Sequence, residues 1–127
     1  MKAYLIDPFK KKIEQVIFNG DYKSIYKFVE CRAFDVVRVY TNEDVIYVDD
    51  EGLFVETQNF FIHRNYPTPL AGKGLVLGSN EEGDSVAPKT TLDQLEKDIA
   101  WVGDKHDIQT IHMFRPGIED YRTFYFE

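Results

Sequence analysis

The amino-acid sequence predicts an α+β fold: a single domain with a largely antiparallel sheet of about seven strands, two helices on one face of the sheet, and a C-terminal β-hairpin. Strand-like stretches follow one another along the chain with turn residues between them, which favours antiparallel pairing. Only two stretches have helical spacing of apolar residues. The length of 127 residues, of which 43% are hydrophobic, suits one core, so we expect residues 1–127 to form one domain.

The first half of the chain is expected to hold two hairpins with a helix between them. Apolar and polar residues alternate on both sides of Pro8, whose fixed φ suits a turn. Asp21 can cap a helix whose tyrosine, isoleucine, phenylalanine and valine side chains share one face. In chain order the expected elements are strands at 2–7 and 12–18, a helix at 22–31, and strands at 35–41 and 44–49.

The second half is expected to combine a central strand, one strong helix and the terminal hairpin. Gly74–Gly78 is short and apolar, as is typical of a central strand, whereas residues 64–72 contain two prolines and are expected to be irregular. Thr91 and Gln94 predict a capping box for a helix that ends near Gly103. The remaining expected strands lie at 53–63, 108–114 and 121–126, the last two forming a hairpin extension over 106–127.

Charge is unevenly distributed in this acidic chain, whose formal net charge is −7. Basic residues prevail up to Arg38, and no Lys or Arg occurs between Arg38 and Arg64. Such a surface repels phosphate backbones, which disfavours direct nucleic-acid binding, and it attracts a basic protein. We expect one exposed, partner-binding edge made of Glu43, Asp44, Asp49, Asp50 and Glu51. The alternative is that these carboxylates only keep the protein soluble.

A competing hypothesis is a pocket for a small ligand or nucleotide. Arg64 and Lys73 are the only Lys or Arg residues within 39–88, so they would mark an anion site. The candidate lining residues are Tyr47, Phe60, His63, Arg64, Tyr66 and Lys73. A deep pocket that brings Arg64 and Lys73 together would favour this hypothesis, and a flat acidic face would favour a protein partner.

The stretch from Gly74 to Ile99 has the order of a phosphate-binding loop but lacks its chemistry. Neither G-x-x-x-x-G-K-[ST] nor G-x-G-x-x-G occurs in it. The loop after the strand carries Glu81, Glu82 and Asp84, which would repel a phosphate. We therefore expect no nucleotide loop here.

No catalytic or metal-ligating set is recognisable, so we expect neither an enzyme, a metal site nor a cofactor. The three histidines, His63, His106 and His112, lack the H-x-x-x-H spacing of a helical metal site, and His112 is expected on a strand face. Cys31 is the single cysteine, which excludes an intrachain disulfide. The N-terminus lacks the apolar region of a signal peptide and no run is long enough to span a bilayer, so we expect a cytoplasmic protein that does not bind membranes.

Several short motifs are shared with a known group of proteins: Asp7–Pro8, Tyr47–Val48–Asp49, Gly52–Leu53, Asn65, Pro67, Leu70 to Gly72 and Gly74 to Gly78. On these motifs, residues 1–102 resemble a family of short proteins of unknown function encoded by phages, prophages and plasmids of bacteria. The resemblance implies a mobile-element origin and action in the cytoplasm of a bacterial host, and it carries no activity. We therefore predict an accessory protein that binds a host or defence protein, with a structural or virion-associated component as a further alternative.

Overall fold

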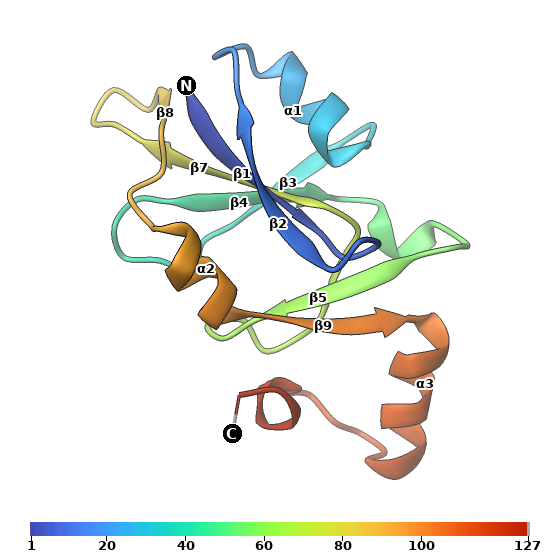
Figure 1. Cartoon of the computed structure of the whole chain (residues 1–127). Coiled ribbons are helices and arrows are strands. Elements are labelled where there is room, and N and C mark those ends of the chain that lie inside the picture. The colour runs from blue at the N-terminus through green and yellow to red at the C-terminus, as the bar shows by residue number, and fades with distance from the viewer. Residues whose placement is uncertain (127) are drawn as a thin grey trace.

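The computed structural model describes residues 1–126 and contains two antiparallel sheets (Figure 1). The larger, six-stranded sheet has the order β2-β1-β7-β4-β3, with β8 paired to the end of β7. Its strands are β1 (Lys2–Asp7), β2 (Lys12–Ile17), β3 (Phe34–Val37), β4 (Val45–Asp49), β7 (Gly74–Ser79) and β8 (Ser85–Val86). The prediction of a central strand at Gly74–Gly78 is confirmed, because β7 lies between β1 and β4 and only Ser79 of its residues is not buried.

The smaller sheet has three strands in the order β6-β5-β9. They are β5 (Asn59–His63), β6 (Leu70–Ala71) and β9 (Ile99–Asp104). The strand expected at 53–63 begins only at Asn59, because Gly52–Phe54 forms a short 3₁₀ helix, η1. Within residues 1–126 the structure thus has nine strands, three α-helices and two 3₁₀ helices, so the predicted class is right and the element count is too low.

The two expected helices lie on opposite faces of the larger sheet, which corrects the prediction that they share one face. Helix α1 (Lys23–Val29) buries Ile25 and Val29 against Leu5 and Leu75. Helix α2 (Leu92–Asp98) buries Leu95 in the cluster on the other face. Successive residues of a strand point to opposite faces, and both faces of β1 and β7 are apolar, so each face needs its own cover.

The core is built in layers (Figure 1). Ile6, Ile46 and Val76 of the larger sheet pack with Phe61 of the smaller sheet and with α2. The opposite side of the smaller sheet, which includes Phe60, is covered by the C-terminal segment. That segment comprises α3 (Lys105–Phe114), Tyr121 and the 3₁₀ helix η2 (Arg122–Phe124).

The C-terminal β-hairpin predicted at 106–127 is wrong over the residues that the structure describes, and Glu127 lies outside them. Residues 108–114 belong to α3, which begins at the capping residue Asp104. Ile108 and Ile111 of this helix are three residues apart and both pack on the smaller sheet. Residues 121–126 hold η2 instead of a strand.

The helix predicted to end near Gly103 stops earlier, because residues from Ile99 onward pair with β5 as strand β9. Its predicted start is confirmed: the Thr91 side chain accepts a hydrogen bond from the Gln94 backbone N–H at 3.2 Å. The Gln94 side chain does not complete the capping box and bonds Asp98 instead. Within residues 1–126 no helix is long and apolar enough to cross a membrane.

Candidate functional site

The acidic residues expected to form one edge are divided between the two ends of β4. Asp44 is buried, and its carboxylate accepts hydrogen bonds from the backbone N–H groups of Lys89 (3.1 Å) and Thr90 (2.7 Å). It therefore fixes the segment before α2 and cannot contribute to an exposed edge. Glu43 is exposed but precedes β4, whereas Asp49 ends that strand, and the four residue steps from Val45 to Asp49 alone span roughly 13 Å at about 3.3 Å per residue. A single edge of five carboxylates is thus wrong.

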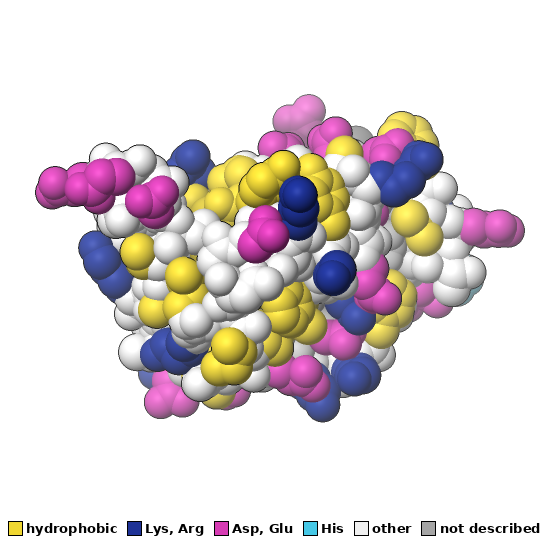
Figure 2. Space-filling view, turned by 90° about the horizontal axis from the view of Figure 1, so that it is seen from above, with side chains coloured by type: hydrophobic (Ala, Val, Ile, Leu, Met, Phe, Trp, Pro, Cys, Tyr) yellow, Lys and Arg dark blue, Asp and Glu magenta, His cyan; other side chains and the backbone are white. Residues whose placement is uncertain are grey.

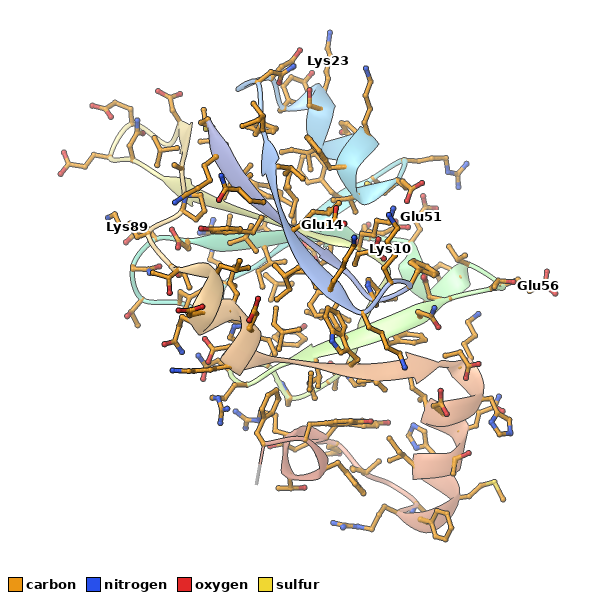
Figure 3. All side chains as sticks on the ribbon, in the orientation of Figure 1. Lys10, Glu14, Lys23, Glu51, Glu56 and Lys89 are labelled. Atoms are coloured by element: carbon orange, nitrogen blue, oxygen red, sulfur yellow. The ribbon has the colours of Figure 1, made fainter. Side chains whose placement is uncertain are left out.

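The remaining carboxylates, Asp49, Asp50 and Glu51, stand beside an exposed apolar turn. We call residues 49–56 the acidic–apolar turn. In it Leu53 is 68% exposed and Phe54 is 85% exposed. Glu56 lies at the tip of the loop that follows η1 (Figure 3). The turn thus combines large apolar side chains with carboxylates on both sides of them in the chain.

The base of the acidic–apolar turn is fixed by buried contacts. A Cβ at Gly52 would lie 2.9 Å from the Cβ of Ala71, so only glycine fits this close approach. The buried Gln58 side chain donates a hydrogen bond to the Gly52 carbonyl at 2.9 Å. Asp49 accepts a hydrogen bond from the Glu51 backbone N–H at 2.9 Å. The exposed side chains are therefore carried on an anchored backbone.

A surface hollow of about 610 Å³ lies beside this turn. Its lining residues come from α1, the segment after it and the turn: Tyr26, Lys27, Glu30, Cys31, Arg32, Asp49, Glu51, Phe54 and Val55. Burial, with the nearby Asp49 carboxylate, raises the pKa of the Cys31 thiol to about 11. The thiol is therefore protonated at neutral pH and is a poor nucleophile.

Acidic side chains are dispersed on the face shown in Figure 2, where they protrude at both ends with hydrophobic and basic side chains between them. On this face the negative charge does not form one continuous patch.

The six residues of the predicted ligand pocket do not converge. Arg64 follows the last residue of β5, whereas Lys73 follows Ala71, which pairs with Phe60 near the start of β5. Lys73 forms an ion pair with Glu30 at 2.5 Å, and Arg64 pairs with Asp98. The other predicted residues lie on different sides of the fold: Tyr47 packs in the cluster under α1, Phe60 under the C-terminal segment, and Tyr66 against the cluster that contains α2.

One of the predicted residues, Arg64, does line a second hollow, of about 540 Å³, which we call the Arg64 pocket. Three segments far apart in sequence supply its polar lining: Tyr40, Asn42, Arg64, Asn65, Lys89, Thr90, Thr91, Gln94 and Asp98. His63 lies directly behind this lining, where its ring bonds Tyr40.

A hydrogen-bonded chain of three side chains forms the floor of the Arg64 pocket. The Asn65 backbone N–H donates to His63 Nδ1 at 3.0 Å, which assigns the proton of the neutral ring to Nε2. His63 Nε2 then donates to the Tyr40 hydroxyl at 2.9 Å. The Tyr40 hydroxyl in turn donates to Asp98 Oδ2 at 2.8 Å. Each group thus has a fixed donor or acceptor role.

Burial determines the protonation states of His63 and Tyr40 in this series of hydrogen-bonded side chains. It lowers the pKa of His63 to about 4, with Asp98 opposing and Arg64 adding to the shift, so the imidazole is neutral near pH 7. Burial also raises the pKa of Tyr40 far above its ordinary value, and Asp98 raises it further. The hydrogen-bonded chain ends at Asp98, whose Oδ1 accepts from Gln94 Nε2 at 2.9 Å and lies 3.5 Å from Arg64 Nε.

Buried polar side chains are concentrated at the Arg64 pocket. Among the described residues the buried polar and charged side chains are Asp7, Asp44, Gln58, His63, Thr90 and Asp98. Thr90 and Asp98 line the pocket, while His63 and Asp44 hold lining residues in place. Burying polar groups is costly unless they are hydrogen-bonded. The side chains around the pocket are therefore held in defined positions by their hydrogen bonds. Sequence reasoning missed Tyr40, Lys89 and Asp98, which no shared motif connects.

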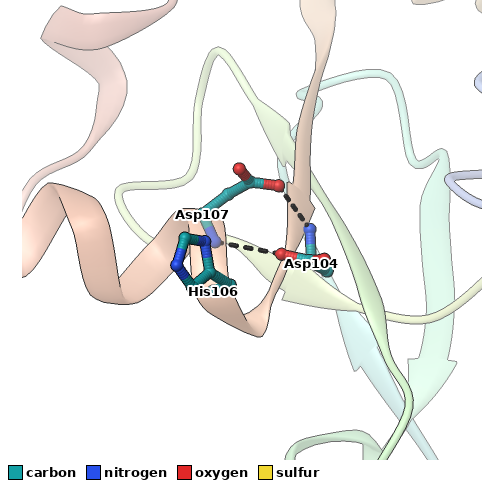
Figure 4. A group of neighbouring side chains, drawn as sticks. All are labelled: Asp104, His106 and Asp107. Carbon is teal, nitrogen blue, oxygen red and sulfur yellow. Dashed lines mark hydrogen bonds between the residues drawn. The ribbon is translucent and has the colours of Figure 1, made fainter.

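A third group, Asp104, His106 and Asp107, has its potential ligand atoms within 4.8 Å of one another at the start of α3 (Figure 4). Its two carboxylates already accept hydrogen bonds from backbone N–H groups at the start of α3. Asp104 accepts from the Asp107 backbone N–H at 3.0 Å, and Asp107 accepts from the Asp104 backbone N–H at 2.9 Å. The Asp107 N–H bond also lowers the pKa of Asp104. Asp104 and Asp107 thus form a capping box, and hydrogen bonding at the helix end explains why these two carboxylates lie together.

His112, expected on a strand face, lies on α3 and contacts Tyr121, with 2.5 Å between its Nε2 and the tyrosine oxygen. This contact helps to attach the C-terminal segment to the helix. The three histidines thus lie in three different places: His63 behind the Arg64 pocket, His106 in the first turn of α3 beside the capping box, and His112 against Tyr121.

Comparison with known proteins gives a family but no activity. The chain is 25% identical over 93 residues to the uncharacterized protein y4iR of Sinorhizobium fredii (strain NBRC 101917 / NGR234). That alignment covers 72% of this chain and 57% of the relative, so the chain spans little more than half of the relative's length. No solved structure matches the chain. Residues 1–100 match the domain of unknown function DUF3846, and the chain therefore belongs to the DUF3846 family.

Proposed function

We propose that this protein is a non-enzymatic accessory protein that binds a partner protein through the acidic–apolar turn. The observation that carries the proposal is the exposure of Leu53 and Phe54 next to Asp49, Asp50 and Glu51 on an anchored backbone. The resemblance to phage and plasmid proteins leads us to propose a bacterial host protein, met in the cytoplasm, as the partner.

The chemistry of the turn indicates the kind of partner. An exposed phenylalanine loses contact with water only when another molecule covers it, and aromatic anchors of this kind dominate many protein interfaces. The carboxylates at the rim would accelerate the approach of a basic surface and contribute less to the final affinity. The partner should therefore present an apolar recess surrounded by Lys or Arg side chains.

The alternatives explain fewer of these features. If the carboxylates served only solubility, the turn would not need a fixed backbone, and it would not need to expose the Phe54 side chain to solvent. A ligand held by both Arg64 and Lys73 has no support, because the two side chains lie at opposite ends of β5. A structural or virion-associated role would require self-association, which sedimentation of the purified protein measures directly.

Affinity capture from a bacterial lysate tests the proposal when it compares matched variants. Phe54→Ser removes the proposed anchor, whereas Ile17→Ser removes a comparably exposed side chain (73%) on β2. The proposal expects a protein that wild type and Ile17→Ser retain and that Phe54→Ser loses. If all three proteins retain the same set, or if both variants lose the same protein, the acidic–apolar turn is not the binding surface.

A further inference from the structure

We propose that the Arg64 pocket binds a small hydrophilic oxyanion, that is, a metabolite carrying a phosphate or carboxylate group. This site is separate from the acidic–apolar turn, and the inference does not depend on the proposed partner binding. Its elements are a fixed arginine, a second cation at the pocket wall, and a lining of hydrogen-bond donors.

Arg64 is held in place before any ligand arrives. Its Nε lies 3.5 Å from Asp98 Oδ1, and its Nη2 donates to the Lys97 carbonyl at 3.0 Å. The guanidinium also lies over the Phe126 ring, 4.7 Å from the ring centroid. The side chain nevertheless stays 47% exposed. A planar guanidinium fixed in this way suits a planar or tetrahedral oxyanion, and a ligand would lose little affinity in ordering it.

Lys89 supplies the second positive charge. It precedes α2, as Figure 3 shows, and its backbone N–H is fixed by the buried Asp44 carboxylate. Its side chain is exposed, and within residues 1–126 no carboxylate lies within salt-bridge distance of it. The ammonium group extends away from α2 in Figure 3 and has no carboxylate partner among residues 1–126, so this flexible side chain is free to turn toward an anion.

The one carboxylate of the lining, Asp98, is paired with Arg64, so its charge is offset by a cation of the same lining. Tyr40 and Gln94 donate to Asp98, and Arg64 pairs with it. The lining thus carries two cations, Arg64 and Lys89, against one satisfied carboxylate, in a chain whose net charge is −7. The buried Asp44 carboxylate lies behind the lining and is bonded to the backbone N–H groups of Lys89 and Thr90, so the charged side chains that line the pocket are Arg64, Lys89 and the paired Asp98.

The remaining lining groups are hydroxyls and amides, which favour a polar ligand. Thr91 Oγ1 accepts the Gln94 N–H, which leaves its own proton to donate. Thr90 Oγ1 likewise accepts from Asn42. A volume of about 540 Å³ falls in the range of small-molecule sites, roughly 300–1,000 Å³. The absence of a phosphate loop at residues 74–90 does not bear on this site, because side chains, not loop N–H groups, supply the charge.

The test is a titration of the full chain, uniformly labelled with ¹⁵N, with inorganic phosphate, ribose 5-phosphate and malate. We expect saturable amide shifts at residues 64–65 and 89–91 with at least one of these probes. Shifts with phosphate and ribose 5-phosphate identify a phosphate site, and shifts with malate alone identify a carboxylate site. Lys89→Gln should weaken binding about tenfold or more, which is the usual effect of losing a charged hydrogen bond.

Lys23→Gln is the matched control, because Lys23 is an exposed lysine on α1 (Figure 3) and lies outside the pocket. It should bind the probe as wild type does. The inference is overturned if no probe gives shifts that saturate by about 10 mM, tenfold above a Kd of 1 mM. It is also overturned if Lys89→Gln and Lys23→Gln weaken binding equally, since the anion would then respond only to overall charge.

Discussion

The hydroxyl of Tyr40 donates a 2.8 Å hydrogen bond to the carboxylate of Asp98, and so joins positions 58 residues apart in the chain. Tyr40 follows β3, whereas Asp98 is the last residue of α2. The bond attaches α2 to the larger sheet at the floor of the Arg64 pocket. Because Asp98 is buried, the free energy of folding depends on this contact more than on a surface hydrogen bond.

Tyr40→Phe should therefore lower the free energy of unfolding by about 1–3 kcal/mol, because it leaves both Asp98 and His63 Nε2 without one partner. Urea denaturation measures this loss. Tyr22→Phe, at a tyrosine that is 60% exposed, removes the same hydroxyl from the surface and should change stability by less than about 0.5 kcal/mol. Equal effects of the two variants would show that the bond to Asp98 contributes nothing beyond a surface hydroxyl.

His63 should make stability depend on pH. Its folded-state pKa of about 4 lies below the ordinary value of 6.5, so between these values the unfolded chain binds more protons than the folded chain. The contribution of neutral His63 is full above pH 6.5 and is lost as the pH falls toward 4, by at most about 1.4 kcal/mol per pH unit. Urea unfolding at pH 7, 6 and 5 measures the slope, which should be smaller in His63→Gln. An unchanged slope would exclude His63 as its source.

The strands of the larger sheet other than the short β8 were predictable, because the local pattern of apolar residues determines them. Gly74–Gly78 is apolar on both sides, and β7 is covered by α1 on one face and by the second sheet on the other. The C-terminal segment was mispredicted because its local pattern is ambiguous. Ile108, His112 and Phe114 alternate, but Ile108 and Ile111 also have helical spacing, and the Asp104–Asp107 capping box decides for the helix.

The Arg64 pocket could be predicted only in part, because its residues meet through tertiary structure. Arg64 stood out as an isolated cation in an acidic stretch, and the structure does place it in a pocket. Its partners depend on where α2 ends: the chain turns from helix to strand after Asp98, which brings this carboxylate beside Arg64. Lys73 was an equally isolated cation, but strand pairing carries it to the other end of β5.

Leu95→Ala should destabilise the protein by about 2–5 kcal/mol, because Leu95 is fully buried between α2 and the larger sheet and its loss leaves a cavity. Thermal or urea unfolding measures the change. Glu96→Ala on the exposed side of the same helix is the control, and it should have an effect below about 0.5 kcal/mol. If Leu95→Ala is no more destabilising than Glu96→Ala, α2 does not bury the face assigned to it.

The carboxylates of the acidic–apolar turn should increase the rate at which a captured partner binds. Asp49→Asn, Asp50→Asn and Glu51→Gln together remove three charges while keeping side chains of nearly the same shape. The amide oxygen introduced by Asp49→Asn can still accept the Glu51 backbone N–H, and the lost ion pair between Arg32 and Glu51 is exposed, so the fold should remain intact.

With this triple variant, association should be slower at low salt, and the difference from wild type should shrink as salt rises, because exposed charges beyond about 10 Å are screened near 0.1 M. Stopped-flow measurement across salt concentrations checks both effects. Glu81→Gln, Glu82→Gln and Asp84→Asn on the loop between β7 and β8 make the same change in net charge away from the turn. If both triple variants slow association equally, the net charge of the protein steers the partner. If neither variant slows association, the carboxylates at 49–51 serve solubility alone. A binding surface at this turn is supported only if the 49–51 variant associates more slowly than the 81–84 variant.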